Sequence, residues 1–264
     1  HTFLNYHPDI AVITNIDPDH LDFFKTEAAY FDAFYTFAES AQCLVMLRDE
    51  AMKHDMVDFA PTTILVSDNE FELVGEPFNG RMPGKYPYTL PYLTVPGDHI
   101  RLDASLAYVV SQLVGIDPAK SATSLEKYPG SWRRMEVLGT TTNGNLFMSD
   151  YGHHPTEIRA TLHALKKAHP SKKLIVFFEP HQYSRTYDLK EDFATSFEHA
   201  DMTYISDIYA ARDIDKRRDL IDAKMLADMI AKNAPCSYVG TLTDAGVQLK
   251  KVDQEEKNAL ILLL

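Results

Sequence analysis

The sequence predicts an α/β protein made of two doubly wound units. Short apolar runs of strand length alternate with longer amphipathic segments along the whole chain, which is the pattern of strands alternating with helices. The chain has 264 residues, 45% of them hydrophobic, so it can bury one large core or two ordinary ones. The stretch Tyr128-Pro129-Gly130-Ser131 has the composition of a linker, and we expect domains at 1–128 and 129–264.

The first domain is expected to begin with a buried strand and to alternate strands with helices. Aromatic side chains recur on one face of the helix at 27–41, and we expect this stripe to belong to the core. Strands are predicted at 10–14, 44–47 and 63–66, and helices at 27–41, 52–59 and 102–114. A further helix is predicted after the last of these and ends at about residue 128.

Residues 77–97 are rich in proline, glycine and tyrosine and are expected to be irregular or to form a hairpin. The segment from Gly80 to Tyr86 resembles a phosphate-binding P-loop only superficially. It has three residues between its glycines where that loop needs four, and a tyrosine follows its lysine. We therefore expect no P-loop within these residues.

The second domain is predicted to open with a hairpin and to continue as a Rossmann-like unit without the Gly-x-Gly-x-x-Gly fingerprint. The dipeptide Asn143-Gly144 is a typical hairpin turn between strands at 134–140 and 145–149. Beyond it, helices are predicted at 156–168, 188–199, 222–232 and 244–251, and strands at 174–178, 203–206, 237–239 and 259–264.

Composition excludes several classes of function. The net charge of −12 disfavours a nucleic-acid-binding surface, which needs a basic stripe. The two cysteines, Cys43 and Cys236, form neither a disulfide framework nor a metal knuckle, which favours a reducing, cytoplasmic setting. No apolar run approaches the roughly 20 residues of a membrane span, so we expect no membrane insertion.

The densest group of reactive side chains follows the strand at 145–149. Residues 150–157, Asp-Tyr-Gly-His-His-Pro-Thr-Glu, supply two carboxylates, two imidazoles, a phenol and a hydroxyl, and Pro155 suits the first turn of a helix. A strand, a polar turn and a helix form the usual ligand site of open α/β sheets, with a helix N-terminus facing an anion. The alternative is an ordinary capped helix start with incidental histidines.

Four stretches taken together resemble the Mur ligases. They are Thr-Asn-Ile-Asp-Pro-Asp-His-Leu-Asp at 14–22, Trp-Arg-Arg-Met-Glu at 132–136, the stretch at 150–157, and Phe-Glu-Pro-His-Gln-Tyr-Ser-Arg-Thr at 178–186. The last two resemble the alanine-adding branch, and the order and spacing of the set match over essentially the whole chain. A central domain of the P-loop type followed by a Rossmann-like C-terminal domain is the fold that this resemblance implies.

The resemblance also implies which parts of such an enzyme are present. Residues 1–128 are similar to the later part of the central ATPase domain, without its P-loop, and residues 129–264 to most of the C-terminal ligase domain. We therefore expect a fragment or partial chain that is inactive without the N-terminal region of the family. The apolar stretch 260–264 is expected to leave a strand edge exposed.

The activity implied by the resemblance is an ATP-dependent ligation in peptidoglycan precursor synthesis. ATP phosphorylates the carboxylate of UDP-N-acetylmuramate, and the amine of L-alanine displaces phosphate from the acyl phosphate to form an amide. The implied cofactors are ATP and Mg²⁺, because charge on the transferring phosphoryl group must be neutralised. The implied partners are these small molecules.

The same resemblance assigns roles to individual residues. His20, His154 and Arg185 are the implied catalytic residues, and His20 is also the implied metal ligand. The implied ATP-binding residues are His99, Arg134, Asp150 and Tyr151, and the implied substrate-binding residues are His153, His181, Tyr183, Ser184 and Arg185. Arg185 can clamp a carboxylate or phosphate with two hydrogen bonds, which a lysine cannot do.

Three residues depart from the family pattern, and other functions remain as alternatives. Ile100 and Asp103 replace asparagines near the implied adenine site, and Gln182 replaces an arginine. These changes fit a divergent murein-peptide ligase or a non-catalytic Mur-ligase-like binding module. A metal-dependent hydrolase is disfavoured because no His-x-His or His-Glu-x-x-His spacing occurs. Its ligands would come from Asp19, His20, Asp22, Asp150, His153 and His154.

Overall fold

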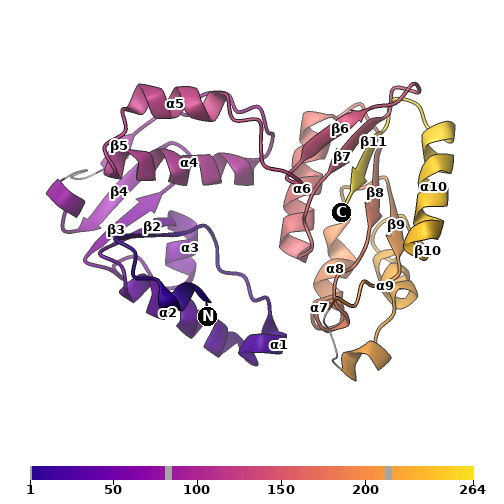
Figure 1. Cartoon of the computed structure of the whole chain (residues 1–264), viewed down its shortest axis with the longest axis horizontal. Coiled ribbons are helices and arrows are strands. Elements are labelled where there is room, and N and C mark those ends of the chain that lie inside the picture. The colour runs from indigo at the N-terminus through magenta and orange to yellow at the C-terminus, as the bar shows by residue number, and fades with distance from the viewer. Residues whose placement is uncertain (1, 81–84, 212–215) are drawn as a thin grey trace. The chain divides into compact units, whose positions relative to one another are not determined.

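The computed structural model describes residues 2–80, 85–211 and 216–264, which form two compact units (Figure 1). The units are His1–Pro129 and Gly130–Leu264, and they divide one residue away from the expected boundary after Tyr128. Each unit has its own sheet. In the described residues, no helix is both long and apolar enough to cross a lipid bilayer.

The first unit is a five-stranded sheet in the order β1-β2-β3-β4-β5. The first three strands are parallel, and β4 and β5 add to them in antiparallel orientation. The strands are β1 (Ile10–Ile13), β2 (Cys43–Leu47), β3 (Thr62–Val66), β4 (Glu70–Gly75) and β5 (Lys85–Pro87). The helices are α1 (Leu21–Phe24), α2 (Glu27–Glu39), α3 (Arg48–Lys53), α4 (Asp98–Leu113) and α5 (Pro118–Glu126), with short 3-10 turns at Thr2–Asn5 and Phe78–Gly80.

Alternate side chains of the interior strand β2 face two different cores, because successive residues of a strand point to opposite faces. Leu44 and Met46 pack in the core that contains the aromatic stripe of α2. Cys43 and Val45 pack in the core that contains Leu106 and neighbouring residues of α4. The aromatic stripe is therefore part of the core, as expected, and both faces of the sheet are covered.

Two features of the first unit differ from the expectation. Strand β4 was not predicted, because its glutamates at 70 and 72 interrupt the apolar pattern by which the other strands are recognised. Helix α3 begins at Arg48, directly after β2, and ends before most of the predicted segment 52–59. In the rejected P-loop segment, residues 81–84 lie outside the described part of the chain.

The second unit is a six-stranded sheet in the order β10-β9-β8-β11-β7-β6. All neighbouring strands are parallel except β6 and β7, which form the predicted hairpin. The strands are β6 (Glu136–Thr140), β7 (Leu146–Ser149), β8 (Leu174–Phe178), β9 (Met202–Ser206), β10 (Cys236–Gly240) and β11 (Leu260–Leu263). The helices are α6 (Pro155–Ala168), α7 (Tyr183–Asp188), α8 (Lys190–Ser196), α9 (Ala223–Ile230) and α10 (Leu242–Glu255), with a 3-10 turn at Lys216–Asp219.

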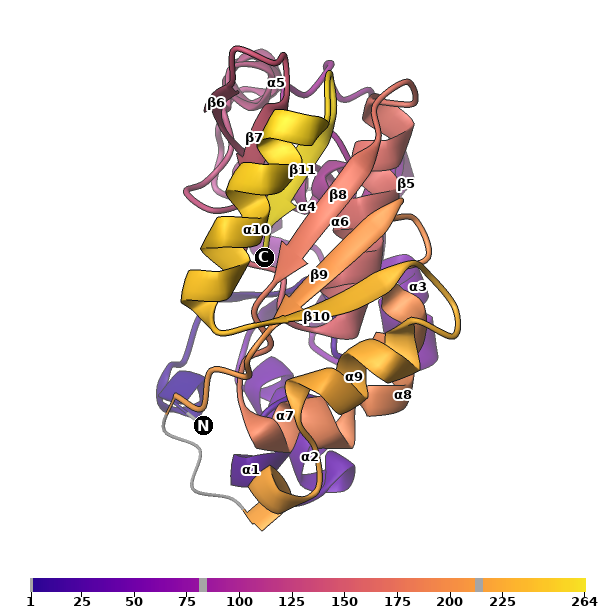
Figure 2. The ribbon, with the colours of Figure 1, turned by 90° about the vertical axis from the view of Figure 1, so that its right-hand side faces the viewer.

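Helices cover both faces of this second sheet. Figures 1 and 2 show α6 and α10 on opposite faces. Ile175 and Phe177 of β8 share a core with residues of α10, such as Val252. Phe178 points the other way, and its ring lies 5.4 Å from that of Phe197, just after α8. The buried strand β8 thus has the continuous apolar sequence of a strand covered on both faces.

Two features of the second unit differ from the expectation. The predicted helix at 188–199 is the shorter helix α8, and α7, which was not predicted, precedes it; the two helices meet at Leu189, whose ψ of 17° departs from helical geometry. The predicted exposed edge at the end of the chain is absent in the described residues, because β11 pairs with β7 on one side and with β8 on the other. Its run of leucine and isoleucine is the sequence of a central strand.

Candidate functional site

Most of the expected site residues of the second unit lie where three neighbouring parallel strands end. The hydrogen-bonded ladder continues beyond these strands: the N–H of Asp150 donates to the carbonyl of Leu263 at 2.9 Å, and that of Glu179 to the carbonyl of Leu264 at 3.2 Å. The loops that follow β7 and β8 therefore start from the same edge of the sheet. This is the position at which open α/β sheets bind ligands.

Asp150 fixes the loop that enters the hairpin. Its side chain is buried, and its two oxygens accept the N–H of Met135 at 2.8 Å and the N–H of Gly152 at 2.7 Å. Met135 has a φ of 47° and Arg133 a φ of 54°, so the loop twice adopts the left-handed conformation that non-glycine residues seldom take. The buried carboxylate helps to hold this unfavourable backbone by accepting one of its N–H groups.

The first turn of α6 is held by two side chains of the motif at 150–157. His154 occupies the N-cap, and its Nδ1 accepts the N–H of Thr156 at 3.3 Å. Glu157 reaches back, and one carboxylate oxygen accepts the N–H of His153 at 3.0 Å and that of His154 at 3.3 Å. Together they form a capping box, in which histidine takes the place of the usual serine or threonine.

The two adjacent histidines must hold opposite tautomers when neutral. Nδ1 of His153 lies 2.9 Å from the carbonyl oxygen of Tyr151, which can only accept, so this nitrogen carries the hydrogen. Nδ1 of His154 accepts a backbone N–H, so the hydrogen of this ring is on Nε2. His153 therefore presents a lone pair on Nε2, whereas His154 presents an N–H donor. The Nε2 atom of His154 is buried and has no partner in the described residues.

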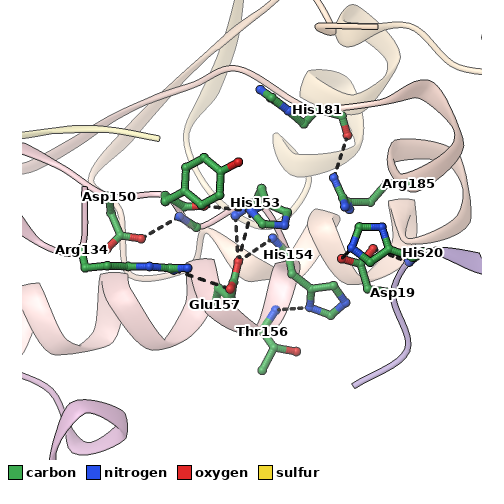
Figure 3. A network of polar contacts seen from close by, with 12 residues as sticks. Asp19, His20, Arg134, Asp150, His153, His154, Thr156, Glu157, His181 and Arg185 are labelled. Carbon is green, nitrogen blue, oxygen red and sulfur yellow. Dashed lines mark hydrogen bonds and ion pairs between the residues drawn. The ribbon is translucent and has the colours of Figure 1, made fainter. Parts of the chain in front are cut away.

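Two arginines contact the half-exposed ring of Tyr151. The guanidinium carbon of Arg133 lies 4.7 Å from the ring centroid and that of Arg134 lies 5.5 Å from it. Arg134 also lies 3.7 Å from a carboxylate oxygen of Glu157 (Figure 3). The ring of His153 meets that of Tyr151 edge-on, with 5.2 Å between the ring centroids. These contacts assemble a cationic and aromatic surface beside the N-terminus of α6.

His181 and Arg185 come from the segment that follows β8. Arg185 in α7 is buried, and its guanidinium donates to the carbonyl of His181 at 3.4 Å. The loop that contains His181 is held by the loop after β9, since Tyr209 donates to the carbonyl of Pro180 at 2.8 Å and Gln182 donates to that of Tyr209 at 2.9 Å. Arg185 is thereby fixed close to His181.

The imidazole of His181 favours its neutral form. Burial lowers the pKa of His181 below its ordinary value, and the positive charges of His153, Arg185 and Arg133 lower it further. A folded-state pKa below the unfolded value means that protonation of His181 opposes folding as the pH falls. Several cationic or hydrogen-bond-donating groups are thus gathered at one edge of the sheet, where an anion would be stabilised.

The two other expected substrate residues also lie in α7. Ser184 is buried, whereas Tyr183 is half-buried and has the guanidinium of Arg218 at 5.4 Å from its ring centroid. Gln182, which departs from the family pattern, has a φ of 69° and accepts the N–H of Thr186 at 3.0 Å through its carbonyl. Its backbone begins the helix that contains Ser184 and Arg185.

Loss of the cap at His154 is expected to lower stability by about 1 kcal/mol, because one N–H of the first turn of α6 loses its acceptor. We expect this for His154→Ala, and we expect His154→Asn to restore most of the lost stability, since asparagine is a favoured N-cap residue. Urea unfolding of the 264-residue chain measures both variants. Equal stabilities for His154→Ala and His154→Asn would contradict the capping role.

The expected metal and adenine residues lie in the first unit. His20 follows β1 and has a left-handed φ of 54°, and its backbone N–H donates to Asp19 at 2.7 Å. Its imidazole is 59% exposed and does not cap α1, so its orientation leaves it accessible to a ligand. His99 lies in the first turn of α4, half-buried, with Ile100 beside it and Asp103 exposed one turn later.

The residues around His20 fit Mg²⁺ only in part. Nε2 of His20 lies 3.6 Å from a carboxylate oxygen of Asp19. The carboxylate of Asp17 is paired with a cation, because its Oδ1 lies 3.6 Å from Nζ of Lys53. Among the described residues, no group of three or more histidine, cysteine or acidic side chains is arranged to hold a metal ion. A hard cation such as Mg²⁺ would need further oxygen ligands from water or from a bound phosphate.

Three residues of the site had no role in the sequence-based interpretation. Glu157 is the third residue after the N-cap, the position of the glutamate in a capping box. That pattern is normally recognised by a serine or threonine at the N-cap, and here the cap is His154. Arg133 and Glu179 lie inside the quoted motifs, but nothing in their local sequence indicates that Arg133 contacts Tyr151 or that Glu179 is half-buried. Those properties depend on which strands are neighbours.

Comparisons with protein families identify both parts of the chain. Residues 133–264 match the model described as "Mur ligase, glutamate ligase domain", and residues 2–73 match the "Mur ligase middle domain". The first of these matches covers half of the chain.

Individual relatives agree with these matches. A UDP-N-acetylmuramate–L-alanine ligase from Alkaliphilus metalliredigens is 34% identical over 258 residues, which cover 90% of this chain and 54% of that protein. One from Caldanaerobacter subterraneus is 34% identical and covers 98% of this chain and 59% of that protein. The chain thus spans little more than half of the length of these curated relatives.

Solved structures share the fold. A UDP-N-acetylmuramate-alanine ligase from Thermotoga maritima has a TM-score of 0.66 at 22% identity and covers 98% of this chain and 56% of that one. A murein peptide ligase from Psychrobacter arcticus has a TM-score of 0.61 at 20% identity and covers 99% of this chain and 55% of that one. At these identities the likeness concerns the fold.

Proposed function

We propose that this chain, which belongs to the Mur ligase family, is part of a ligase that uses ATP to join L-alanine to UDP-N-acetylmuramate. The reaction would form a precursor of peptidoglycan in the cytoplasm. One observation carries the proposal: the donors of His154, His181 and Arg185 gather at one edge of the sheet, where a carboxylate and its phosphorylated form need positive charge. The names of the relatives at 34% identity agree with it.

On the substrate side, buried donors would orient the reacting carboxylate. The guanidinium of Arg185 offers two parallel N–H groups, the geometry that a carboxylate or an acyl phosphate accepts. The Nε2–H of His154 is a donor without a partner in the described residues, so a ligand oxygen that reached it would supply the missing acceptor. Tyr183 and Ser184 would contribute to the same subsite from α7.

On the nucleotide side, we assign Asp150, Tyr151 and Arg134 to ATP. The carboxylate of Asp150 already accepts two backbone N–H groups, and each oxygen retains a lone pair for a ribose hydroxyl. His99 in the first unit would contribute to the adenine site, although Ile100 beside it offers no hydrogen bond to a base.

When bound, Mg²⁺ would neutralise charge on the phosphates. We assign His20 and Asp19 to it, with the remaining ligands supplied by water and phosphate oxygens. The 59% exposure of the His20 imidazole is compatible with this role.

The test measures phosphate release and amide formation by the full-length protein that contains this chain. We expect both products only when ATP, Mg²⁺, UDP-N-acetylmuramate and L-alanine are all present. The 264-residue chain alone serves as a second arm, and we expect it to release no phosphate above the no-enzyme control, because its sequence carries no phosphate-binding glycine loop.

Other outcomes of the same test identify the competing functions. Turnover with a murein peptide in place of L-alanine would favour a divergent murein-peptide ligase. Nucleotide binding without any turnover would favour a non-catalytic binding module. Hydrolysis of an ester without ATP would favour a metal-dependent hydrolase.

A further inference from the structure

We propose that Glu179 receives the amine of the incoming amino acid: its carboxylate binds the ammonium group and accepts a proton from it. This inference rests on the proposed ligase function and adds to it a residue for the second half-reaction. The sequence-based interpretation assigns no role to Glu179, although this residue follows a buried strand of the site directly.

The position of Glu179 is fixed by the sheet. Its backbone N–H donates to the carbonyl of Leu264, and the N–H of Leu264 donates to the carbonyl of Phe177 at 2.9 Å, so the loop begins in register with β11. Asp150 leaves the same edge two strands away, on the other side of β11. Neighbouring strands are spaced by about 4.8 Å, which places the backbones of Asp150 and Glu179 roughly 10 Å apart.

The other carboxylates of this edge are already engaged. Asp150 accepts two backbone N–H groups. Glu157 accepts two more and faces Arg134 and His153. In contrast, among the residues that the structure describes, the Glu179 carboxylate takes part in no hydrogen bond or ion pair. It is the acceptor that remains for a cationic group of the substrate.

The charges around Glu179 are consistent with a site in which other groups bind the anions and Glu179 binds the ammonium group. The Nε2–H of His154 and the guanidinium of Arg185 are suited to anions, namely the carboxylate and the phosphate that leaves. Half-burial raises the pKa of Glu179 above its ordinary value, and the nearby positive charge of Arg133 partly opposes this effect. A carboxylate with a raised pKa is a stronger base, and desolvation makes an ammonium ion a favourable partner for it.

The step balances without a further reactant. One proton passes from the ammonium group of the amino acid to Glu179, which leaves a neutral amine and a carboxylic acid. The lone pair of the amine then forms a C–N bond to the acyl carbon while the C–O bond to phosphate breaks. The phosphate leaves with the electron pair of that bond and takes the second proton of the nitrogen.

The test compares two nucleophiles in the full-length protein and in its Glu179→Gln variant. Hydroxylamine is already uncharged near neutral pH, so it can trap the acyl phosphate as a hydroxamate without an ammonium site or a base. We expect Glu179→Gln to lower amide formation with L-alanine by about 10²-fold, the lower range for loss of a general base, and to leave hydroxamate formation unchanged. Glu191→Gln, on the exposed surface of α8, is the control and is expected to change neither rate.

Each other outcome counts against the proposal in a recognisable way. If Glu179→Gln slows both nucleophiles equally, the residue acts on folding or on phosphoryl transfer, and a thermal unfolding curve separates these two causes. If it slows neither, the residue has no role in the reaction. If the unmodified protein forms neither product, the proposed ligase function fails, and the assignment of Glu179 fails with it.

Discussion

Replacing Arg185 by lysine is expected to lower the rate of amide formation in the full-length protein by about 10²-fold, the usual cost of one lost donor to a developing charge. The physical reason is geometric. Lysine keeps the positive charge but loses the planar pair of N–H groups that can hold a carboxylate or an acyl phosphate in one orientation. Arg185 lies in α7, and Arg134, Asp150 and Tyr151, which are assigned to ATP, lie in a different segment of the chain, so nucleotide affinity is expected to change little.

The measurement is a comparison of steady-state turnover with the Kd for ATP. Arg159→Lys is a suitable control, because Arg159 is on α6 and makes a hydrogen bond of 3.1 Å to Thr195 that a lysine can replace. A thermal unfolding curve checks that the buried Arg185 position tolerates lysine. Equal losses in turnover and in ATP affinity would contradict a role on the substrate side.

Replacing Asp150 by alanine is expected to destabilise the protein by roughly 2–6 kcal/mol, because two N–H groups lose their acceptor at about 1–3 kcal/mol each. Both bonds are buried, and one of them holds Met135 in its left-handed conformation. Asp150→Asn keeps one acceptor oxygen, so its free energy of unfolding should lie between that of the unmodified protein and that of Asp150→Ala. Denaturant unfolding gives the free energies, and hydrogen exchange at Met135 and Gly152 localises the change.

A control on the surface separates this effect from a general loss of charge. Asp228 in α9 pairs with Lys224, and both side chains are 66% exposed, so Asp228→Ala should leave the unfolding free energy nearly unchanged. If Asp150→Ala were as stable as Asp228→Ala, the two backbone hydrogen bonds of Asp150 would contribute nothing. The loop before β6 would then be held by other contacts.

The elements of the fold that were predictable are those with a strong local signal. The strand at Leu174–Phe178 was predicted to the residue, because a continuous apolar run of strand length, rich in β-branched and aromatic residues, favours a strand covered on both faces. The Asn143-Gly144 turn predicted the hairpin for an equally local reason. Strand β4 has charged residues at alternate positions, and the break at Leu189 is a change in backbone angle without a proline or glycine. Neither leaves a clear mark in the sequence.

The candidate site was located from the sequence, but its internal pairings were not. The motif at 150–157 marked the correct strand end and the start of α6. The acceptor of the Met135 N–H lies 15 residues farther along the chain, and the tautomers of His153 and His154 depend on which backbone group each ring faces. Such facts follow from three-dimensional proximity, which a single sequence does not record.

The central place of β11 has a consequence for the order in which the second unit can assemble. The ribosome makes β6 to β10 first, and the place between β7 and β8 is taken by Leu260–Leu263, which come after the other strands that the structure describes in that sheet. Until those residues emerge, two apolar strands present unpaired edges to other chains. A nascent chain that stalls a few residues before Leu260 would therefore carry β6 to β10 and still lack the strand that lies between β7 and β8.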